Sequence, residues 1–371
     1  MTPNPSTTAQ KPINPNGSSP PIQQGWKIFT LADAYIPRSP VVYLIENILE
    51  LPSLNVVYGA PSSLKSFILA DMAICIATGK EWLNPPSTYS PAASGSKGNI
   101  QKCKPKSVTQ CSVLWIDFDN GQRRTHERFD MLGKGHSVPD TTPLFYTSMP
   151  NPPLMLNNDA SLAYLTSMIK ASNAKLVVID NLGTVTGAKV DENSADMVLV
   201  MFNLRKVVEE TGAAIIVIHH QRKANGFKTR MGETLRGHSS IEASLDLALL
   251  VERDPGSKEI RIQSTKSRGI DVKPFGAIFE HTKDAQDIES AKFYGTFIED
   301  TDSDDAIKQA ILDVVTTNMP GINQKDIVEE VKGLLDDPGV HRIKRLLQAL
   351  VAEGKLDTVP AGKNSKFYII P

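Results

Sequence analysis

The chain has 371 residues, of which 40% are hydrophobic and 22% are charged, and its formal net charge at pH 7 is −1. This length predicts two domains, or one large domain with an appendage. The near-neutral charge excludes a globally basic nucleic-acid binder, so any DNA contact must come from local basic patches. No apolar run reaches the roughly 18 residues that a membrane span needs. The three cysteines form no CxxC motif, which favours free thiols in a cytoplasmic protein without a membrane partner.

Residues 1–25 are rich in Pro, Ser, Thr, Asn and Gln, and this composition predicts a disordered tail. The segment has no apolar core, so it is not expected to be a secretory leader. Mixed apolar patterning resumes at Trp26, and Val41–Ile45 is predicted to form a strand or a lid beside a nucleotide.

The most informative stretch runs from Leu54 to Phe67, where an apolar run breaks at Gly59 and a helical pattern starts after Lys65. Strand, short loop and helix in this order are the context of a phosphate-binding P-loop. Backbone N–H groups at the helix N-terminus would face a polyphosphate. Lys65 would reach the β- and γ-phosphates of ATP, and the Ser66 hydroxyl would bind Mg²⁺. The predicted ATP-binding residues are Gly59, Ala60, Pro61, Ser62, Ser63, Leu64, Lys65, Ser66 and Phe67.

Leu64 stands where the P-loop pattern G-x-x-x-x-G-K-[ST] has its second glycine. A side chain at this position restricts the backbone and crowds the phosphates. Two outcomes stay open: the loop accepts Leu64 at a negative φ, or nucleotide binding is weakened or lost. An ordinary strand–turn–helix with a chance Lys-Ser pair is the alternative explanation.

Further along the chain, apolar and helical patterns alternate. Helices are predicted at Lys65–Thr78, Arg123–Leu132, Asp159–Ala171 and Ala195–Gly212. A Pro- and Gly-rich surface insertion is predicted at 84–110, a short strand at Pro143–Tyr146, and a polar loop at Leu182–Ser194. Later hairpin-like strands are predicted at Leu245–Val251, Ile260–Ser264 and Gly276–Glu280.

Three apolar strands end in polar residues. They are Ser112–Asp119, Leu176–Asn181 and Ala213–Ile218. Because the carboxyl ends of parallel strands meet at one edge of a sheet, these residues should gather near the P-loop. Asp180 would hold Mg²⁺ opposite Ser66, although many buried strands end in Asp. His219 and His220 would contact the γ-phosphate or the attacking water, whereas a lone histidine here would more often be structural.

Basic residues gather in a loop at Gln221–Arg236 that also contains two glycines. Such a loop can follow a phosphate backbone, and an ordinary solvated loop is the alternative. The predicted nucleic-acid contacts of this loop are Arg222, Lys223, Lys228 and Arg230. A second basic pair, Lys266 and Arg268, follows the strand at Ile260–Ser264.

An acidic stretch, Glu299–Asp305, separates the first part of the chain from a different pattern. Three helices are predicted beyond it, at Ala306–Thr316, Gln324–Val331 and Val340–Glu353, followed by a hairpin at Lys355–Val359 and Lys366–Ile370. This is the element order of a winged helix, whose third helix would contact DNA through Arg342, Lys344 and Arg345. Winged helices also serve as protein–protein modules. The predicted domains are therefore a tail (1–25), an ATPase domain (26–300) and a winged-helix domain (301–371).

The order of these motifs resembles the RecA-like ATPases, and most closely the plasmid RepA-type hexameric helicases and their single-domain relatives in phages and mobile elements. The resemblance covers residues 26–298 and rests on four phrases: Tyr58-Gly59-Ala60-Pro61, Val178-Ile179-Asp180-Asn181, Ile218-His219-His220 and Leu235-Arg236-Gly237. The implied fold is α/β, with a RecA-like P-loop core around a mostly parallel central sheet and a C-terminal winged-helix domain.

The resemblance also implies roles for individual residues. Asp119 would activate the attacking water at a position where the family usually has Glu, and its shorter side chain could shift that role to Asp117. Lys266 and Arg268 look like the basic fingers that such hexamers insert into the neighbouring subunit's active site. The loop after His220 would line a DNA channel.

The implied function is an ATP-hydrolysing, ring-forming DNA helicase, a homo-oligomer and most often a hexamer, that replicates a plasmid, phage or mobile element with other replication proteins. Its cofactors would be ATP and Mg²⁺, and its polymer partner would be DNA. One alternative is an ATP-regulated DNA-binding initiator or regulatory protein without unwinding activity. Another is a scaffold that has lost ATPase activity through Leu64.

Overall fold

The computed structural model describes residues 28–85, 104–186, 197–221, 239–269, 271–283, 289–296, 304–318, 321–335, 338–361 and 364–369. Several sequence predictions fall outside these residues: the tail at 1–25, most of the 84–110 insertion, most of the acidic stretch, and the basic-loop residues Arg222, Lys223, Lys228 and Arg230. The chain divides into two compact units, 1–41 and 42–371, which we describe one by one.

The first unit contains one short helix, α1 (Leu31–Tyr35), among its described residues. The helix begins with a capping box, in which the Thr30 side chain accepts the Asp33 N–H and the Asp33 carboxylate accepts the Thr30 N–H. Two otherwise unsatisfied backbone donors are paired in this way, which explains why so short a helix starts at this residue.

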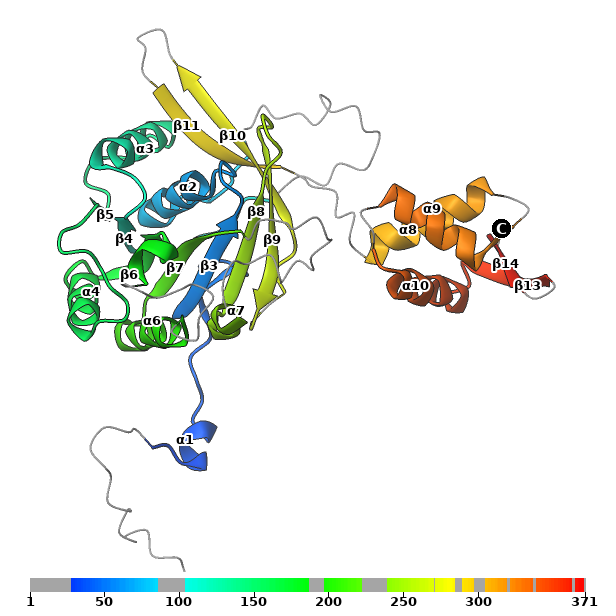
Figure 1. The fold of residues 1–371 in the computed structure, drawn as a ribbon, viewed down its shortest axis with the longest axis horizontal. Coiled ribbons are helices and arrows are strands. Elements are labelled where there is room, and N and C mark those ends of the chain that lie inside the picture. Colours follow the sequence, from blue (N-terminus) through cyan, green and yellow to red (C-terminus); the bar gives the residue numbers. More distant parts are fainter. Residues whose placement is uncertain are drawn as a thin grey trace, which may run out of the picture. The chain divides into compact units, whose positions relative to one another are not determined.

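The second unit is built on a nine-stranded sheet in the described part of the chain, with the strand order β11-β10-β9-β8-β3-β7-β6-β4-β5 (Figure 1). Strands β3 to β8 run parallel, and β9 to β11 extend the sheet in antiparallel fashion. The predicted α/β fold with a mostly parallel central sheet is confirmed. The strands are β3 (Ser53–Gly59), β4 (Ser112–Asp117), β5 (Leu144–Ser148), β6 (Ala174–Asp180), β7 (Ala214–His220), β8 (Leu247–Glu252), β9 (Glu259–Ser267), β10 (Phe275–Lys283) and β11 (Glu289–Thr296).

Helices cover both faces of this sheet, as its continuous apolar strands require. Helices α2 (Lys65–Thr78) and α3 (Gln122–Gly135) lie on one face, and α4 (Asp159–Ala171) and α6 (Met197–Thr211) lie on the other (Figure 1). Each face buries its own apolar cluster. The helices predicted at 65–78 and 159–171 have the predicted bounds, and the other two differ only at their ends.

Four parts of the central α/β core differ from the sequence predictions. The segment predicted as a polar loop begins with a helical turn, α5 (Leu182–Val185), because the Asn181 side chain accepts the Thr184 N–H and caps it. Helix α7 (Ser239–Ser244) and strand β11 were not predicted. In strand β11 every second residue points inward, which is the alternation of a half-buried strand, and this signal was overlooked. The fourth is the hairpin described next.

A hairpin precedes the P-loop strand and comprises β1 (Val42–Ile45) and β2 (Leu49–Leu51). Its first strand was predicted. The hairpin leads into Ser53, the first residue of β3, and its Glu50 carbonyl accepts a hydrogen bond from the Ser53 hydroxyl. It therefore lies at the end of β3 opposite to Gly59, and the predicted position beside the nucleotide is wrong.

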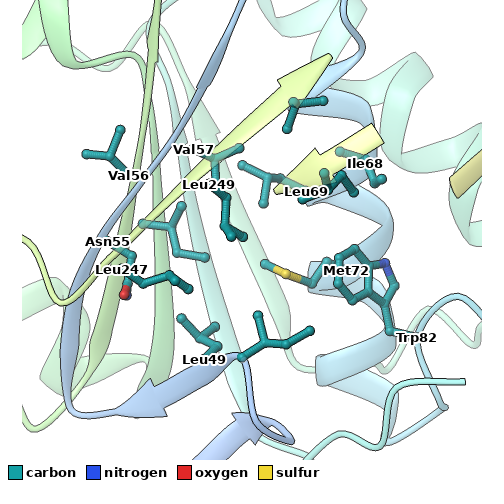
Figure 2. A pocket seen from close by; sticks show the side chains of 14 residues that line it. Leu49, Asn55, Val56, Val57, Ile68, Leu69, Met72, Trp82, Leu247 and Leu249 are labelled. Atoms are coloured by element: carbon teal, nitrogen blue, oxygen red, sulfur yellow. The ribbon is translucent and has the colours of Figure 1, made fainter. Parts of the chain in front are cut away.

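A small apolar cavity of about 20 Å³ lies between the sheet and α2. Figure 2 shows Val57, Leu69, Met72, Trp82 and Leu249 around it. The cavity has the volume of about one water molecule and no polar lining atoms exposed to it, so it is a packing defect of the core. It is separate from the loop that follows Gly59.

The C-terminal residues form three helices and a three-stranded antiparallel sheet in the order β12-β14-β13, with an apolar cluster of their own. These elements are α8 (Asp304–Thr317), β12 (Ile322–Asn323), α9 (Gln324–Leu334), α10 (Val340–Ala352), β13 (Leu356–Ala361) and β14 (Asn364–Ile369). The predicted three helices and hairpin are present, and their assignment to a winged-helix domain stays a prediction. No helix among the described residues is long and apolar enough to cross a bilayer.

Candidate nucleotide site

Four strands of the central sheet end together at one edge. In the register of these strands, Gly59 of β3 lies opposite His220 of β7, and Asp180 of β6 lies opposite Ile218 of β7. Asp117 of β4 lies opposite Asp180. The parallel sheet therefore brings the P-loop and the polar strand ends to one place, as predicted from the strand pattern.

Gly59 is required where β3 turns into the loop. A Cβ atom at this residue would lie 2.2 Å from the Val251 carbonyl oxygen of the neighbouring strand β8. Because this contact is to backbone, no side-chain movement could relieve it, and only glycine fits. The first glycine of the motif thus serves the packing of the sheet as well as the turn.

Leu64 adopts the backbone conformation that a glycine would favour. Its φ is 65° and that of Ser62 is 66°, so both lie in the left-handed region. The expectation that Leu64 would be accepted at a negative φ is therefore wrong. This conformation costs a non-glycine residue about 1–2 kcal/mol. Two contacts offset the cost: the half-buried Leu64 side chain packs against the α2-side core, and Arg253 Nη1 donates to the Ser62 carbonyl at 3.1 Å.

Leu64→Gly is expected to tighten ATP binding by several-fold while leaving the melting temperature nearly unchanged. The substitution removes the left-handed strain and the side chain beside the phosphates, but it also removes apolar burial and adds glycine entropy of about 1 kcal/mol. Titration of ATP and thermal unfolding measure the two effects. Ser62→Gly, which relieves a similar strain at an exposed side chain, is the matched control. Weaker ATP binding by Leu64→Gly would show that the leucine supports the loop.

Lys65 lies inside the loop and is only 7% exposed. Its ammonium group donates to the Ala60 carbonyl at 2.8 Å and to the Ser63 hydroxyl at 3.4 Å. Burial lowers the pKa of Lys65, while the carboxylates of Asp180 and Asp119 act to raise it. Lys65 is thus held between the loop and the acidic strand ends, where a phosphate would meet it.

Ser66 and Asp180 lie close together, as their predicted common role requires. The Ser66 hydroxyl lies near enough to the Asp180 carboxylate to act on its pKa, and Asp180 is 1% exposed. Burial is the main cause that raises the pKa of Asp180, to about 6. Among the described residues the Asp180 Oδ2 atom has no hydrogen-bond partner, and its ion pair with Arg128 is 3.7 Å long. A buried carboxylate oxygen in this state fits a hard cation such as Mg²⁺.

The first turn of α2 offers donors for an anion. No side chain among the described residues caps this N-terminus, and the first turn contains no acidic residue. The first N–H groups of a helix have no partner within the helix, and the helix dipole favours negative charge there. The loop and α2 therefore fit the phosphates of a nucleotide.

The two carboxylates after β4 have different environments. Asp119 lies two residues beyond the strand, is exposed, and accepts a hydrogen bond from Asn181 Nδ2 at 3.1 Å. Asp117 is fully buried, and its carboxylate accepts the backbone N–H groups of Asp119 and Asn120 and the Thr125 hydroxyl. The suggestion that Asp117 could take over the role of the base is therefore wrong, because its oxygens hold the loop that carries Asp119.

Arg128 was not predicted as a site residue, and it lies beneath this edge. Its Nη1 atom is 3.4 Å from Asp117 and 3.7 Å from Asp180, and its guanidinium lies 5.1 Å from the centre of the Phe67 ring. It is one of four buried residues that recur at helical spacing in α3, together with Thr125, Phe129 and Leu132. The sequence did contain a signal for this residue: a charged side chain on the apolar face of the predicted helix at Arg123–Leu132.

The two histidines that follow the apolar part of β7 point to opposite faces of the sheet, because successive side chains in a strand alternate. His219 is 0% exposed. His220 is half-buried and lies opposite Gly59 in the register. The histidines therefore do not form the predicted pair at one place, and His220 is the one at the start of the P-loop.

Lys266 and Arg268 lie at the other end of the sheet. Ser267 is paired with Leu247 at the start of β8, and Leu247 with Asn55 of β3, which is four residues, or about 13 Å along the strand, from Gly59. Arg268 donates to the Ala243 carbonyl, and its Nη1 atom is 3.5 Å from Asp246. These two residues do not join the nucleotide site of their own chain.

The predicted DNA-contacting residues of the C-terminal part lie on α10. Arg342 and Arg345 both form ion pairs with Asp304, at 2.8 and 2.9 Å, and the cause of the lowered pKa of Asp304 is chiefly its hydrogen bond with Arg342. Lys344 is exposed. Because one carboxylate faces both arginines, the positive charge of α10 toward DNA is smaller than the sequence predicts.

Comparison with known proteins was made on sequence and on structure. A family model described as "AAA domain" matches residues 28–226, which is more than half of the chain. No curated protein matches the sequence. Among solved structures, the "ATPase Domain of G40P" is similar with a TM-score of 0.44 and 12% sequence identity, over 62% of this chain and 81% of that chain. The P-loop, the buried Asp180 and the family match agree, and this chain belongs to the AAA domain family of ATPases.

Proposed function

We propose that this protein is an ATP-driven motor that acts on DNA, assembles as a homo-oligomeric ring and unwinds duplex DNA in the manner of a replicative helicase. The observation that carries the ATPase part is the buried Asp180 carboxylate, whose Oδ2 atom has no hydrogen-bond partner among the described residues, close to the buried Lys65 of the loop. The order of motifs, which resembles that of the RepA-type helicases, supports the DNA-motor part.

The described residues include candidates for binding the phosphates, holding Mg²⁺ and activating water. Lys65 and the N–H groups at the start of α2 would bind the phosphates, and Ser66 and Asp180 would hold Mg²⁺. Bound Mg²⁺ would neutralise charge on the β- and γ-phosphate oxygens. Asp119 would accept a proton from the attacking water, whose oxygen forms the new bond to the γ-phosphorus as the bond to the ADP oxygen breaks.

Asp119→Asn is expected to lower the turnover number for ATP by about 10²–10⁴-fold with little change in ATP affinity. The amide keeps the shape of the side chain but cannot accept a proton, and general bases contribute rate factors of this size. Steady-state phosphate release and ATP titration measure the two quantities. Asp140→Asn, which changes an exposed aspartate outside the site, is the control. Unchanged turnover would show that another group is the base.

Lys266 and Arg268 would act on the neighbouring subunit in a ring, because they lie at the end of the strands opposite to the P-loop of their own chain. In that case Asp119→Asn and Arg268→Ala subunits should each hydrolyse ATP slowly alone and faster when mixed. In a mixed ring, some sites would combine the intact Asp119 of one subunit with the intact Arg268 of its neighbour. Equilibrium mixing over a range of ratios tests this. A rate equal to the weighted mean of the separate rates would contradict shared sites.

The motor function is tested by measuring ATP hydrolysis with and without single-stranded DNA, followed by strand displacement on a forked duplex. A motor should hydrolyse ATP several-fold faster on single-stranded DNA and should separate the strands only with ATP. DNA-independent turnover without strand displacement would contradict it.

A second candidate, an ATP-regulated DNA-binding initiator without unwinding activity, is favoured by the left-handed Leu64. Strain and crowding in the phosphate loop would slow turnover, and slow turnover suits a switch better than a motor. This candidate predicts that ATP changes the oligomeric state measured by light scattering, while hydrolysis stays slow and does not respond to DNA.

A further inference from the structure

Three buried side chains of different chemistry meet between α2, α3 and β11, on residues that the nucleotide site does not use. They are Asp71 and Cys75 of α2 and His136, which follows the last residue of α3. Their ligand atoms all lie within 4.8 Å of one another. His136 Nε2 is 2.6 Å from Asp71 Oδ1, and Cys75 Sγ is 3.9 and 4.0 Å from the two ring nitrogens of His136.

One atom of this cluster lacks a partner within the described residues. Asp71 is 0% exposed, and its Oδ2 atom accepts no hydrogen bond, whereas Oδ1 accepts from His136 and from the Phe293 N–H. A buried carboxylate oxygen without a partner is costly, because it has lost its water and gained nothing in return. The free oxygen belongs to a residue that already faces a thiol and an imidazole.

The backbone holds the three residues rigidly. Asp71 and Cys75 are four residues apart on one face of α2. At the end of α3, Gly135 packs so closely on β11 that a Cβ atom there would lie 2.0 Å from the Ala291 carbonyl oxygen. Lys80 donates to the His136 carbonyl, which fixes the turn that carries the imidazole. Rigid elements and outer contacts of this kind favour a defined ligand geometry.

We propose that Asp71, Cys75 and His136 form a binding site for a zinc ion. A thiolate, an imidazole nitrogen and a carboxylate oxygen form a donor set that suits Zn²⁺ rather than Mg²⁺ or Ca²⁺. Cys75 would bind as the thiolate, its proton leaving to solvent. The two negative charges of Asp71 and Cys75 would then balance the charge of the ion.

The required movement is small. Tetrahedral zinc bonded to these atom types places its ligand atoms about 3.3–3.6 Å from one another. The His136–Asp71 contact must therefore open by less than about 1 Å, and the Cys75 sulfur must approach His136 by a few tenths of an ångström and the Asp71 carboxylate, which lies within 4.8 Å of it, by about 1.3 Å at most. The fourth position would be taken by water or by a backbone carbonyl. The ion would clamp α2, which carries Lys65, to α3, which carries Arg128.

The test is the zinc content of the full chain, purified after growth with added zinc salt and dialysed, and measured by elemental mass spectrometry. The wild type should hold one zinc per chain. Cys75→Ala and His136→Gln should each lower the affinity for zinc, measured by competition with a chromophoric chelator, by more than about 100-fold, since outer-shell changes alone cost about 10–100-fold. Cys111→Ala, which removes the other described thiol, is the matched control and should bind zinc like the wild type.

Cobalt provides a spectroscopic measurement that can be made on the wild type itself. The wild type and Cys111→Ala, loaded with Co²⁺, should show a thiolate-to-cobalt charge-transfer band, and Cys75→Ala should lack it. No zinc in the wild type, or the same zinc affinity in wild type and Cys75→Ala, would overturn the proposal. The second result would place any bound zinc elsewhere in the chain.

Discussion

Lys65→Ala is expected to lower ATP hydrolysis by at least about 100-fold and to weaken ATP binding. Lys65 is the buried cation of the P-loop and faces Asp180 and Asp119. In its absence the phosphates would face Asp180 and Asp119 without the ammonium group of the loop. Removing one preorganised charge-stabilising donor costs a factor of about 10²–10³ in rate. Phosphate release and calorimetric ATP titration measure the two effects.

Lys170→Ala is the matched control for this substitution. Lys170 is a surface lysine on α4 that forms a 2.7 Å ion pair with Glu210, so its removal changes the net charge equally without touching the P-loop. Exposed pairs of this kind contribute little to stability. Normal hydrolysis by Lys65→Ala would remove the assignment of residues 59–67 as the phosphate-binding loop.

Asp180→Asn is expected to change activity and stability in opposite directions. Hydrolysis should be lost, because the amide is a poor ligand for Mg²⁺. The nucleotide-free protein should become more stable at pH 7–8, by up to about 2–3 kcal/mol, because burial raises the pKa of Asp180 from 3.8 to about 6. A raised pKa means that the folded state binds this proton more tightly than the unfolded state does.

The upward direction of the Asp180 pKa shift determines how the gain in stability depends on pH. The stability cost of the ionised Asp180 is absent below pH 3.8, grows as the pH rises toward about 6, and is complete above it. The advantage of Asp180→Asn should therefore shrink as the pH is lowered from 7 to 5. Denaturant unfolding at several pH values checks this trend, with Asp140→Asn as the control. A variant that is less stable than the wild type at pH 8 would contradict the burial argument.

The parts of the fold that sequence could predict are those with strong local signals. The strand at 53–59, the helix at 65–78 and the gathering of strand ends near Asp180 all follow from apolar runs and from the parallel arrangement that such runs favour. Asp119 and Asp117 have the same side chain two residues apart, so composition could not separate them. The hydrogen bonds from Thr125 and from backbone N–H groups, which come with folding, make Asp117 structural.

Other features depend on contacts between distant residues. The left-handed Leu64 is held by packing and by a loop that Arg253 supports from 189 residues further along the chain. The contacts of Arg128 and of the Asp71 cluster arise from the packing of α2 against α3, although the place of Arg128 among the apolar positions of α3 was a local signal. The pairing of strand β11 with β10 also depends on such contacts, whereas the strand itself has the alternation that predicts a half-buried strand and was overlooked.

The most direct test of the central claim, that the loop after Gly59 binds a nucleotide although Leu64 replaces a glycine, is titration of the full wild-type chain with a fluorescent ATP analogue, with and without Mg²⁺. We predict saturable binding of one nucleotide per chain that becomes tighter when Mg²⁺ is added, because Ser66 and the free oxygen of Asp180 would hold the ion. No saturable binding at millimolar nucleotide, with or without Mg²⁺, would contradict the account.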